Sequence, residues 1–172
     1  LVTGDPSQVY EVRFGEADVG DVTMTITALD GTQPTIEEVV GGTFDSPSLA
    51  DLDRDGTEEL LVPLFTGAQN TAYAVWARPT PAAPFVRAGD VSGLGFGLTT
   101  DGYIVVGGHA SAAASYADLY LLRSGVLVPI TFLELDAEQD TCTLTQTTGL
   151  GEIGLDEATA RDRFCADPAI VG

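Results

Sequence analysis

The chain has 172 residues, with 26 acidic side chains, seven arginines, no lysine and a formal net charge of −19 at pH 7. This charge excludes nucleic-acid binding, which needs basic side chains that displace phosphate counterions, and it disfavours adhesion to anionic membranes. Hydrophobic residues make up 44% of the chain, enough for a buried core, and no apolar run is long enough for a membrane-spanning helix. We therefore expect a single β-rich domain over residues 1–172, without a membrane span.

In the first part of the chain, apolar and polar residues alternate, which is the period of a half-buried β-strand. Between residues 22 and 29 the alternation is with threonine, so the apolar members of the run are expected to face inward. They are Val22, Met24, Ile26 and Ala28. Asp30-Gly31 then predicts a tight turn. Strands are predicted over residues 9–14, 22–29 and 35–40.

A more continuously apolar run, Glu59 to Phe65, predicts a central strand. Because Pro63 has no N–H to donate to a ladder, it indicates a sheet edge or a bulge at that point. Ser124-Gly125 predicts a hairpin turn further along the chain. The remaining strands are predicted over residues 72–77, 85–87, 94–98, 103–107, 116–123, 126–135 and 141–147.

Only the C-terminal tail has helical character. Asp156 is a suitable N-cap, and Ala160 and Phe164 belong to an apolar face one turn apart. A helix is therefore predicted over about residues 156–165, with Pro168 ending it. Many short strands and one helix predict an antiparallel all-β fold, either a sandwich or a propeller-like stack of sheets.

The most informative stretch is Asp51-Leu52-Asp53-Arg54-Asp55-Gly56-Thr57-Glu58-Glu59. Carboxylates stand at positions 1, 3, 5 and 9 of a loop, and a glycine at position 6 permits a sharp bend. Calcium takes about six to eight oxygen ligands from such loops, whereas magnesium is poorly suited to all-protein cages. The predicted calcium ligands are Asp51, Asp53, Asp55, the carbonyl of Thr57, and Glu59. The alternative is a solvated acidic turn without a metal.

The loop is not an EF-hand, because its position 12 is Val62 and its flanks are strand-like. With Phe44 before it and Leu60-Leu61-Val62 after it, it resembles the FG-GAP or VCBS calcium loop of integrin-like propellers, in which the motif recurs in every blade. Here it occurs once.

Over roughly residues 36–135, an aspartate loop and a strand are followed by a small-residue turn, an aromatic strand, a Ser/Gly-rich loop and a Tyr-rich strand. This order is similar to that of small periplasmic proteins with one such loop. That family includes i-type lysozyme inhibitors and calcium-binding immunity proteins against lysozyme-like effectors. The resemblance implies a calcium-binding inhibitor or immunity protein, not an enzyme, whose partner is a basic lysozyme-like glycosidase. The FG-GAP resemblance implies an alternative: a calcium-stabilised adhesion or carbohydrate-binding module without catalysis.

In the inhibitor family, a loop of small residues that ends in tyrosine enters the glycosidase cleft. The matching positions here are Ser111-Ala112-Ala113-Ala114-Ser115-Tyr116. Ala112 and Ala113 stand where the i-type inhibitors carry serine and glycine. The resemblance implies that Ser111, Ser115 and Tyr116 bind the partner. The alternative is a plain hairpin tip, with Tyr116 as the first core residue of the next strand.

The sequence offers little support for a catalytic site. His109 is the single histidine and is accompanied by neither a GxSxG elbow nor an HExxH motif. Residues 149–154 match GxGxxG, but the chain continues for too few residues to supply the second parallel strand of a dinucleotide fold. We therefore expect a binding protein, with a Gly-rich linker at residues 149–154.

The two cysteines, Cys142 and Cys165, are too few ligands for a zinc site. They are either one disulfide, which indicates an oxidising compartment, or two free buried thiols. Because the first residue is Leu1, we also expect that a signal peptide or lipid anchor was removed. Together these features favour a periplasmic or extracellular protein.

Overall fold

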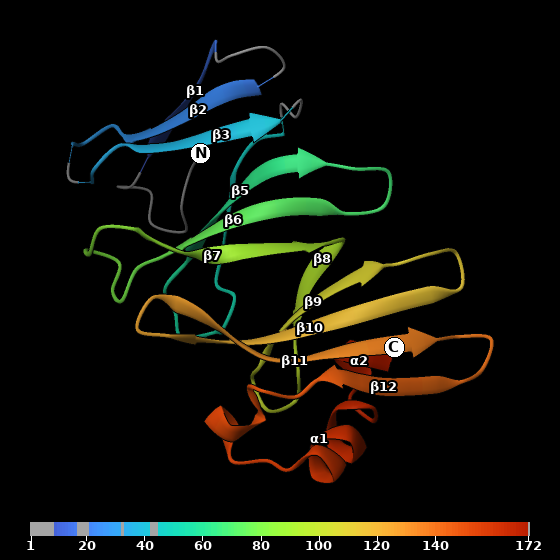
Figure 1. Cartoon of the computed structure of the whole chain (residues 1–172). Helices are drawn as coiled ribbons and strands as arrows, with labels where there is room; N and C mark the ends of the chain where they lie inside the picture. The colour runs from blue at the N-terminus through green and yellow to red at the C-terminus, as the bar shows by residue number, and fades with distance from the viewer. Residues whose placement is uncertain (1–8, 17–20, 32, 42–44, 172) are drawn as a thin grey trace. The chain divides into compact units, whose positions relative to one another are not determined.

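The computed structural model describes residues 9–16, 21–31, 33–41 and 45–171. Its strands form three antiparallel sheets, and its helices lie near the C-terminus (Figure 1). The all-β prediction is confirmed. By internal contacts the chain divides into two compact units, Leu1–Asp51 with Asp55–Val91, and Leu52–Arg54 with Ser92–Gly172. Each unit is described by itself.

Two sheets make up most of the first unit, a three-stranded sheet in the order β1-β2-β3 and a four-stranded sheet in the order β4-β5-β6-β7. Their bounds are β1 Tyr10–Glu16, β2 Asp21–Ala28, β3 Ile36–Gly41, β4 Ser48–Ala50, β5 Glu59–Thr66, β6 Thr71–Ala77 and β7 Val86–Gly93. β4 was not predicted, since three residues are too few to show a period of two. β7 extends well beyond the predicted residues 85–87, because its glycines and its aspartate obscure the alternation.

The predicted inward face of β2 forms part of the core of this unit. Met24 and Ile26 are 0% and 1% exposed, and the alternating threonines are only half-buried. Leu60 and Val62 of β5 join the same apolar cluster, so the two sheets share one core. Full burial of such a side chain contributes about 1.5–3 kcal/mol.

β5 pairs with β4 on one side and β6 on the other, so it is a central strand as predicted. Its pairing with β6 shifts in register between Pro63 and Phe65. This irregularity confirms the bulge that the proline indicated, because proline cannot supply a ladder hydrogen bond.

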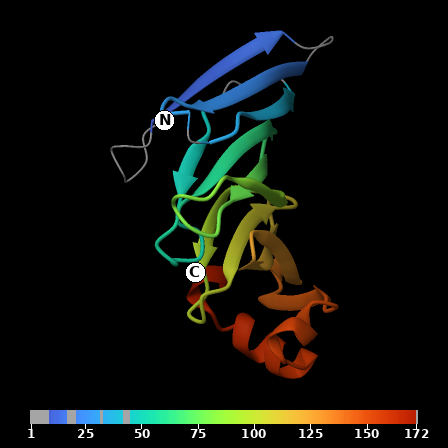
Figure 2. The same cartoon turned by 90° about the vertical axis from the view of Figure 1, so that its left-hand side faces the viewer.

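The second unit contains a five-stranded sheet in the order β12-β11-β10-β9-β8, followed by short helices. Figure 2, the view turned by 90°, shows the twist of its strands. The strand bounds are β8 Gly95–Leu98, β9 Ile104–His109, β10 Ala114–Arg123, β11 Val126–Asp136 and β12 Thr141–Gln146. The hairpin predicted at Ser124-Gly125 joins β10 to β11.

Three short helical segments follow β12: the 3-10 helix η1 Leu150–Ile153, α1 Glu157–Phe164 and α2 Pro168–Val171. The side chain of Asp156 accepts a hydrogen bond from Thr159 N at 2.8 Å, so the predicted N-cap and helix are confirmed. Phe164 is 0% exposed and packs in the core of this unit. In the described part of the chain, no helix has the length and apolar character that crossing a bilayer requires.

Pro168 begins α2, and α1 has already ended at Phe164. Proline is well tolerated in the first turn of a helix, where its missing N–H is not needed. Asp167 supports this start by accepting hydrogen bonds from Ala169 N at 2.9 Å and Thr100 N at 2.7 Å. Burial works to raise the pKa of the Asp167 carboxyl, but these backbone donors lower it more, so the pKa falls below its usual value.

Candidate functional site

The acidic loop begins directly after β4 and ends at the first residue of β5. Its backbone curls around its own carboxylates: Gly56 N donates to Asp51 Oδ2 at 3.1 Å, and Thr57 N donates to Asp55 Oδ1 at 2.6 Å. Gly56 has a φ of 90°, in the left-handed region that glycine adopts most readily. The structure thus has the sharp bend that the glycine predicted. Phe44, named in the resemblance, lies outside the described residues.

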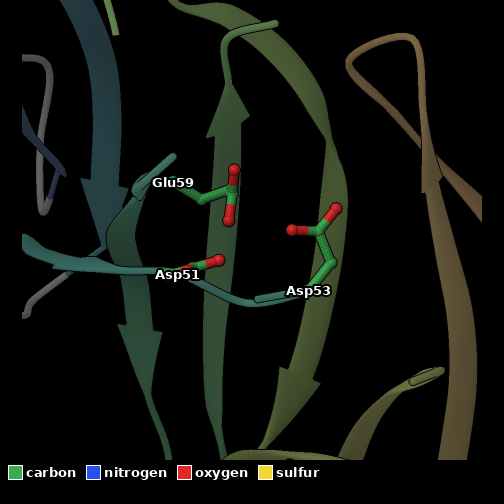
Figure 3. A group of neighbouring side chains, drawn as sticks. All are labelled: Asp51, Asp53 and Glu59. Carbon is green, nitrogen blue, oxygen red and sulfur yellow. The ribbon is translucent and has the colours of Figure 1, made fainter. Parts of the chain in front are cut away.

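Three of the predicted ligands come together. One carboxylate oxygen from each of Asp51, Asp53 and Glu59 lies within 4.8 Å of the others, and Figure 3 shows the three groups turned toward one another. Two oxygens that each lie about 2.4 Å from one calcium ion are at most about 4.8 Å apart. The spacing therefore fits three oxygens around one ion.

Burial differs across this cluster. Asp51 is exposed, Asp53 is half-buried, and Glu59 is only 1% exposed. A buried carboxylate is costly unless opposite charge or hydrogen bonds compensate it, and two further carboxylates beside it raise that cost. A divalent cation at the centre would offset part of this repulsion.

The predicted ligand Asp55 is placed differently. The carboxylate of Asp55 is not a member of the cluster, and its Oδ1 is engaged by the backbone of Thr57. Thr57 itself is buried. Three carboxylate oxygens are fewer than the six to eight ligands that calcium takes, so further carboxylate oxygens, carbonyls or waters would complete its coordination.

The predicted partner loop is a tight hairpin turn between β9 and β10. Ser111 Oγ accepts hydrogen bonds from Ala113 N at 3.3 Å and Ala114 N at 3.1 Å, which closes the turn. Ser115 lies beyond the turn on β10, opposite His109 of β9. The two serines therefore occupy different positions, one at the exposed tip and one on the ladder.

Tyr116 is anchored to the sheet. Its hydroxyl donates to Ser92 O at 2.8 Å, and its ring stacks on Phe132 with centroids 5.4 Å apart and an angle of 19° between the planes. Burial raises the pKa of the Tyr116 hydroxyl above its usual value. The ring is half-buried. These contacts hold the ring against the sheet, but Tyr116 is not a member of the buried core cluster of this unit.

Cys142 of β12 and Cys165, directly after α1, form a disulfide with a Cα–Cα distance of 5.8 Å. This settles the choice between a disulfide and two thiols. The bond is consistent with an oxidising compartment. It also joins the last strand to the helical tail.

A further group of polar side chains was not predicted. Asp136, Asp140, Arg161 and Asp162 line a cavity of about 940 Å³ in the second unit. In the sequence each of these is an ordinary surface charge. The only available signal was the disulfide pairing, since it brings the turn after β11 next to α1.

Comparisons of this chain with protein-family models, with curated proteins and with solved structures find no match in any of the three.

Proposed function

We propose that this protein is a calcium-binding protein of the periplasm or the extracellular space that inhibits a basic lysozyme-like glycosidase and has no catalysis of its own. The observation that carries the proposal is the convergence of Asp51, Asp53 and Glu59 in a loop that enters a central strand. The disulfide supports an oxidising compartment, and the net charge of −19 supports a basic partner.

Calcium acts here through structure. Its charge neutralises part of the acidic cluster, and its ligands join the loop to the first residue of β5. A ligand that binds only the folded state stabilises it by about 2.7 kcal/mol when its free concentration is 100 times Kd. Calcium binding and folding are therefore coupled.

The test of calcium binding is isothermal titration of EDTA-treated protein, together with melting curves in calcium and in EDTA. We expect binding heat and a higher Tm in calcium. Asp53→Asn and Glu59→Gln each remove one charged ligand and should weaken binding at least tenfold, or about 1.4 kcal/mol. Glu58→Gln is the matched control, because it removes the same charge from a residue outside the cluster. Absence of binding heat and of any Tm change would refute the calcium site.

Inhibition is tested separately, with a panel of lysozymes in the presence of calcium. We expect inhibition of at least one enzyme, and weaker inhibition as salt is added, because charge steers the encounter. Tyr116→Phe keeps the ring that stacks on Phe132 but removes the hydroxyl that donates to Ser92 O, so weaker inhibition with an unchanged Tm would assign the hydroxyl to the partner contact. Lack of inhibition across the panel would leave calcium binding intact and remove the inhibitor function.

The alternative, a calcium-stabilised adhesion or carbohydrate-binding module, is favoured by the half-buried, stacked pair of Tyr116 and Phe132. Aromatic faces of this kind are common contact surfaces for ligands. Binding to a glycan array that is lost in Phe132→Ala, without lysozyme inhibition, would support this function in place of the first.

A further inference from the structure

The cavity of about 940 Å³ in the second unit, called here the tail pocket, lies where the strands meet the helical tail. β10 contributes Ser115, β11 contributes Leu135 and Asp136, and β12 contributes Cys142. α1 contributes Arg161 and Asp162. Ile170 of α2 closes another part of the wall. Most of the lining side chains are exposed or half-buried, so the cavity is open to solvent.

The walls of the tail pocket are held in place by a disulfide and by local hydrogen bonds. The Cys142–Cys165 disulfide lines the cavity and ties β12 to the end of α1. Asp136 Oδ1 accepts hydrogen bonds from Glu138 N at 2.9 Å and Gln139 N at 3.0 Å, which holds the turn between β11 and β12. A ligand would meet preformed walls, so binding costs little ordering of the protein.

The charges of the lining are mostly negative. Asp136, Asp140 and Asp162 face a single cation, Arg161. The nearest pair, Arg161 Nε and Asp162 Oδ1, is 3.7 Å apart, with side chains 58% and 80% exposed. Such an exposed ion pair contributes little free energy. The cavity therefore presents more negative charge than its own arginine compensates, and it is complementary to a cationic ligand.

The rest of the lining narrows the class of cation. Leu135, Ile170 and the disulfide form apolar wall, which suits the methylene stem of an arginine or lysine side chain. The guanidinium of Arg161 has only hydrogen-bond donors, so it needs an acceptor on the ligand, such as a backbone carbonyl. A peptide offers both a cationic side chain and carbonyl acceptors, whereas a polyamine has no carbonyl.

We propose that the tail pocket binds a basic segment of a polypeptide partner, with one arginine or lysine side chain inserted between the three aspartates and the apolar wall. This inference goes beyond the proposed function and does not depend on it, since neither lysozyme inhibition nor calcium binding enters the argument. It assigns a partner contact to the tail pocket, whose lining includes Ser115 of the predicted partner loop but neither Ser111 nor Tyr116.

The experiment is an amide NMR titration of the full chain with the capped tripeptide acetyl-Leu-Arg-Leu-amide, at 150 mM NaCl. We expect shifts concentrated in residues 135–142 and in α1 and α2. The triple variant Asp136→Asn, Asp140→Asn, Asp162→Asn should weaken binding at least tenfold. The control triple Glu11→Gln, Glu37→Gln, Glu157→Gln removes the same charge outside the pocket and should change binding less than twofold.

If the triple variant does not fold, Asp140→Asn alone serves the same purpose. Asp140 has a φ of 52°, and asparagine tolerates this left-handed conformation, so the change removes charge without backbone strain. The proposal predicts at least a threefold loss for this variant. It is overturned if the shifts are scattered over the surface, if both triples weaken binding equally, or if spermidine or acetyl-Leu-Gln-Leu-amide binds as tightly as the arginine peptide.

Discussion

Gly149 packs directly against the backbone of β11. A Cβ placed there would lie 2.1 Å from Pro129 O and 2.6 Å from Ile130 O, far inside normal contact distances. In the sequence this glycine opens a GxGxxG-like stretch, predicted as a linker. In the structure the stretch forms the short helix η1, and its first glycine allows η1 to start against the sheet.

We predict that Gly149→Ala lowers the free energy of unfolding by about 2–3 kcal/mol, because the methyl group forces two backbone segments apart. Gly151→Ala is the control in the same stretch, since a Cβ there has no neighbour within 4 Å. The control should change stability by less than about 0.5 kcal/mol. Urea denaturation followed by circular dichroism measures both, and equal effects would contradict the packing argument.

Asp118 lies half-buried on β10 between two tyrosines. Burial raises the pKa of its carboxyl to about 6, and burial together with the charge of Asp118 raises the pKa of Tyr120 to about 12. The folded state therefore binds the Asp118 proton more tightly than the unfolded chain does. Protonation of this residue stabilises the fold as the pH falls from about 6 towards 4.

Asp118→Asn removes the cost of this buried charge, so we predict that it raises the free energy of unfolding at pH 7 by about 1–2 kcal/mol, allowing for solvent screening. The gain should shrink as the pH is lowered to about 4, where the native carboxyl is itself protonated. Glu134→Gln, an exposed residue of the neighbouring strand, is the control for loss of charge alone. Denaturant titrations at a series of pH values test this, and a gain that is independent of pH would contradict it.

At the scale of the element, the helical tail is held to the sheet by packing and by one covalent bond. Phe164 and Ala160 of α1 are both 0% exposed and share a core cluster with Leu133 and Leu144. Because α1 has only 8 residues, its N-cap and these two buried side chains decide where it forms and how it packs. The disulfide then joins Cys142 to Cys165, which are 23 residues apart in sequence.

We predict that the double variant Cys142→Ala, Cys165→Ala unfolds with a free energy lower by about 3 kcal/mol, because the disulfide restricts the unfolded chain. Dithiothreitol should destabilise the unchanged protein by a similar amount and leave the double variant unaffected. Thermal melts with and without the reductant measure this. Equal sensitivity of the two proteins to dithiothreitol would contradict the assignment of the effect to this bond.

For the whole molecule, the net charge of −19 determines how stability depends on salt. Like charges repel in the folded chain, and this repulsion is screened as the Debye length falls from about 30 Å at 0.01 M to about 8 Å at 0.15 M. Salt also weakens attractive ion pairs such as Arg163 with Asp101, which lowers stability. This effect is the smaller one, because the described residues contain far fewer arginines than carboxylates.

We predict that raising NaCl from about 10 to 150 mM, in EDTA, increases stability by about 1 kcal/mol, which corresponds to a Tm increase of about 2–4 °C for a chain of this size. EDTA removes the separate effect of calcium. Differential scanning calorimetry measures the shift. A lower Tm at the higher salt concentration would mean that attractive ion pairs outweigh the net repulsion.

The sequence by itself determined most of the strands and the helix α1. A period of two along β2, the proline in β5 and the Asp156 cap are local signals, and local backbone physics decides them. Two cysteines allow only one intramolecular pair. The acidic loop was predicted for the same reason, since its bend depends on neighbouring residues. β4 was missed because it is too short to have a period.

Only the tertiary structure decided which polar groups meet. It brings Asp51, Asp53 and Glu59 together, whereas Asp55 Oδ1 accepts from the loop backbone. It also fixes Tyr116 through Ser92 and Phe132, which are far from it in sequence, and it forms the tail pocket from three strands and the helical tail. Such contacts depend on how distant segments pack, and a local sequence pattern carries no information about that packing.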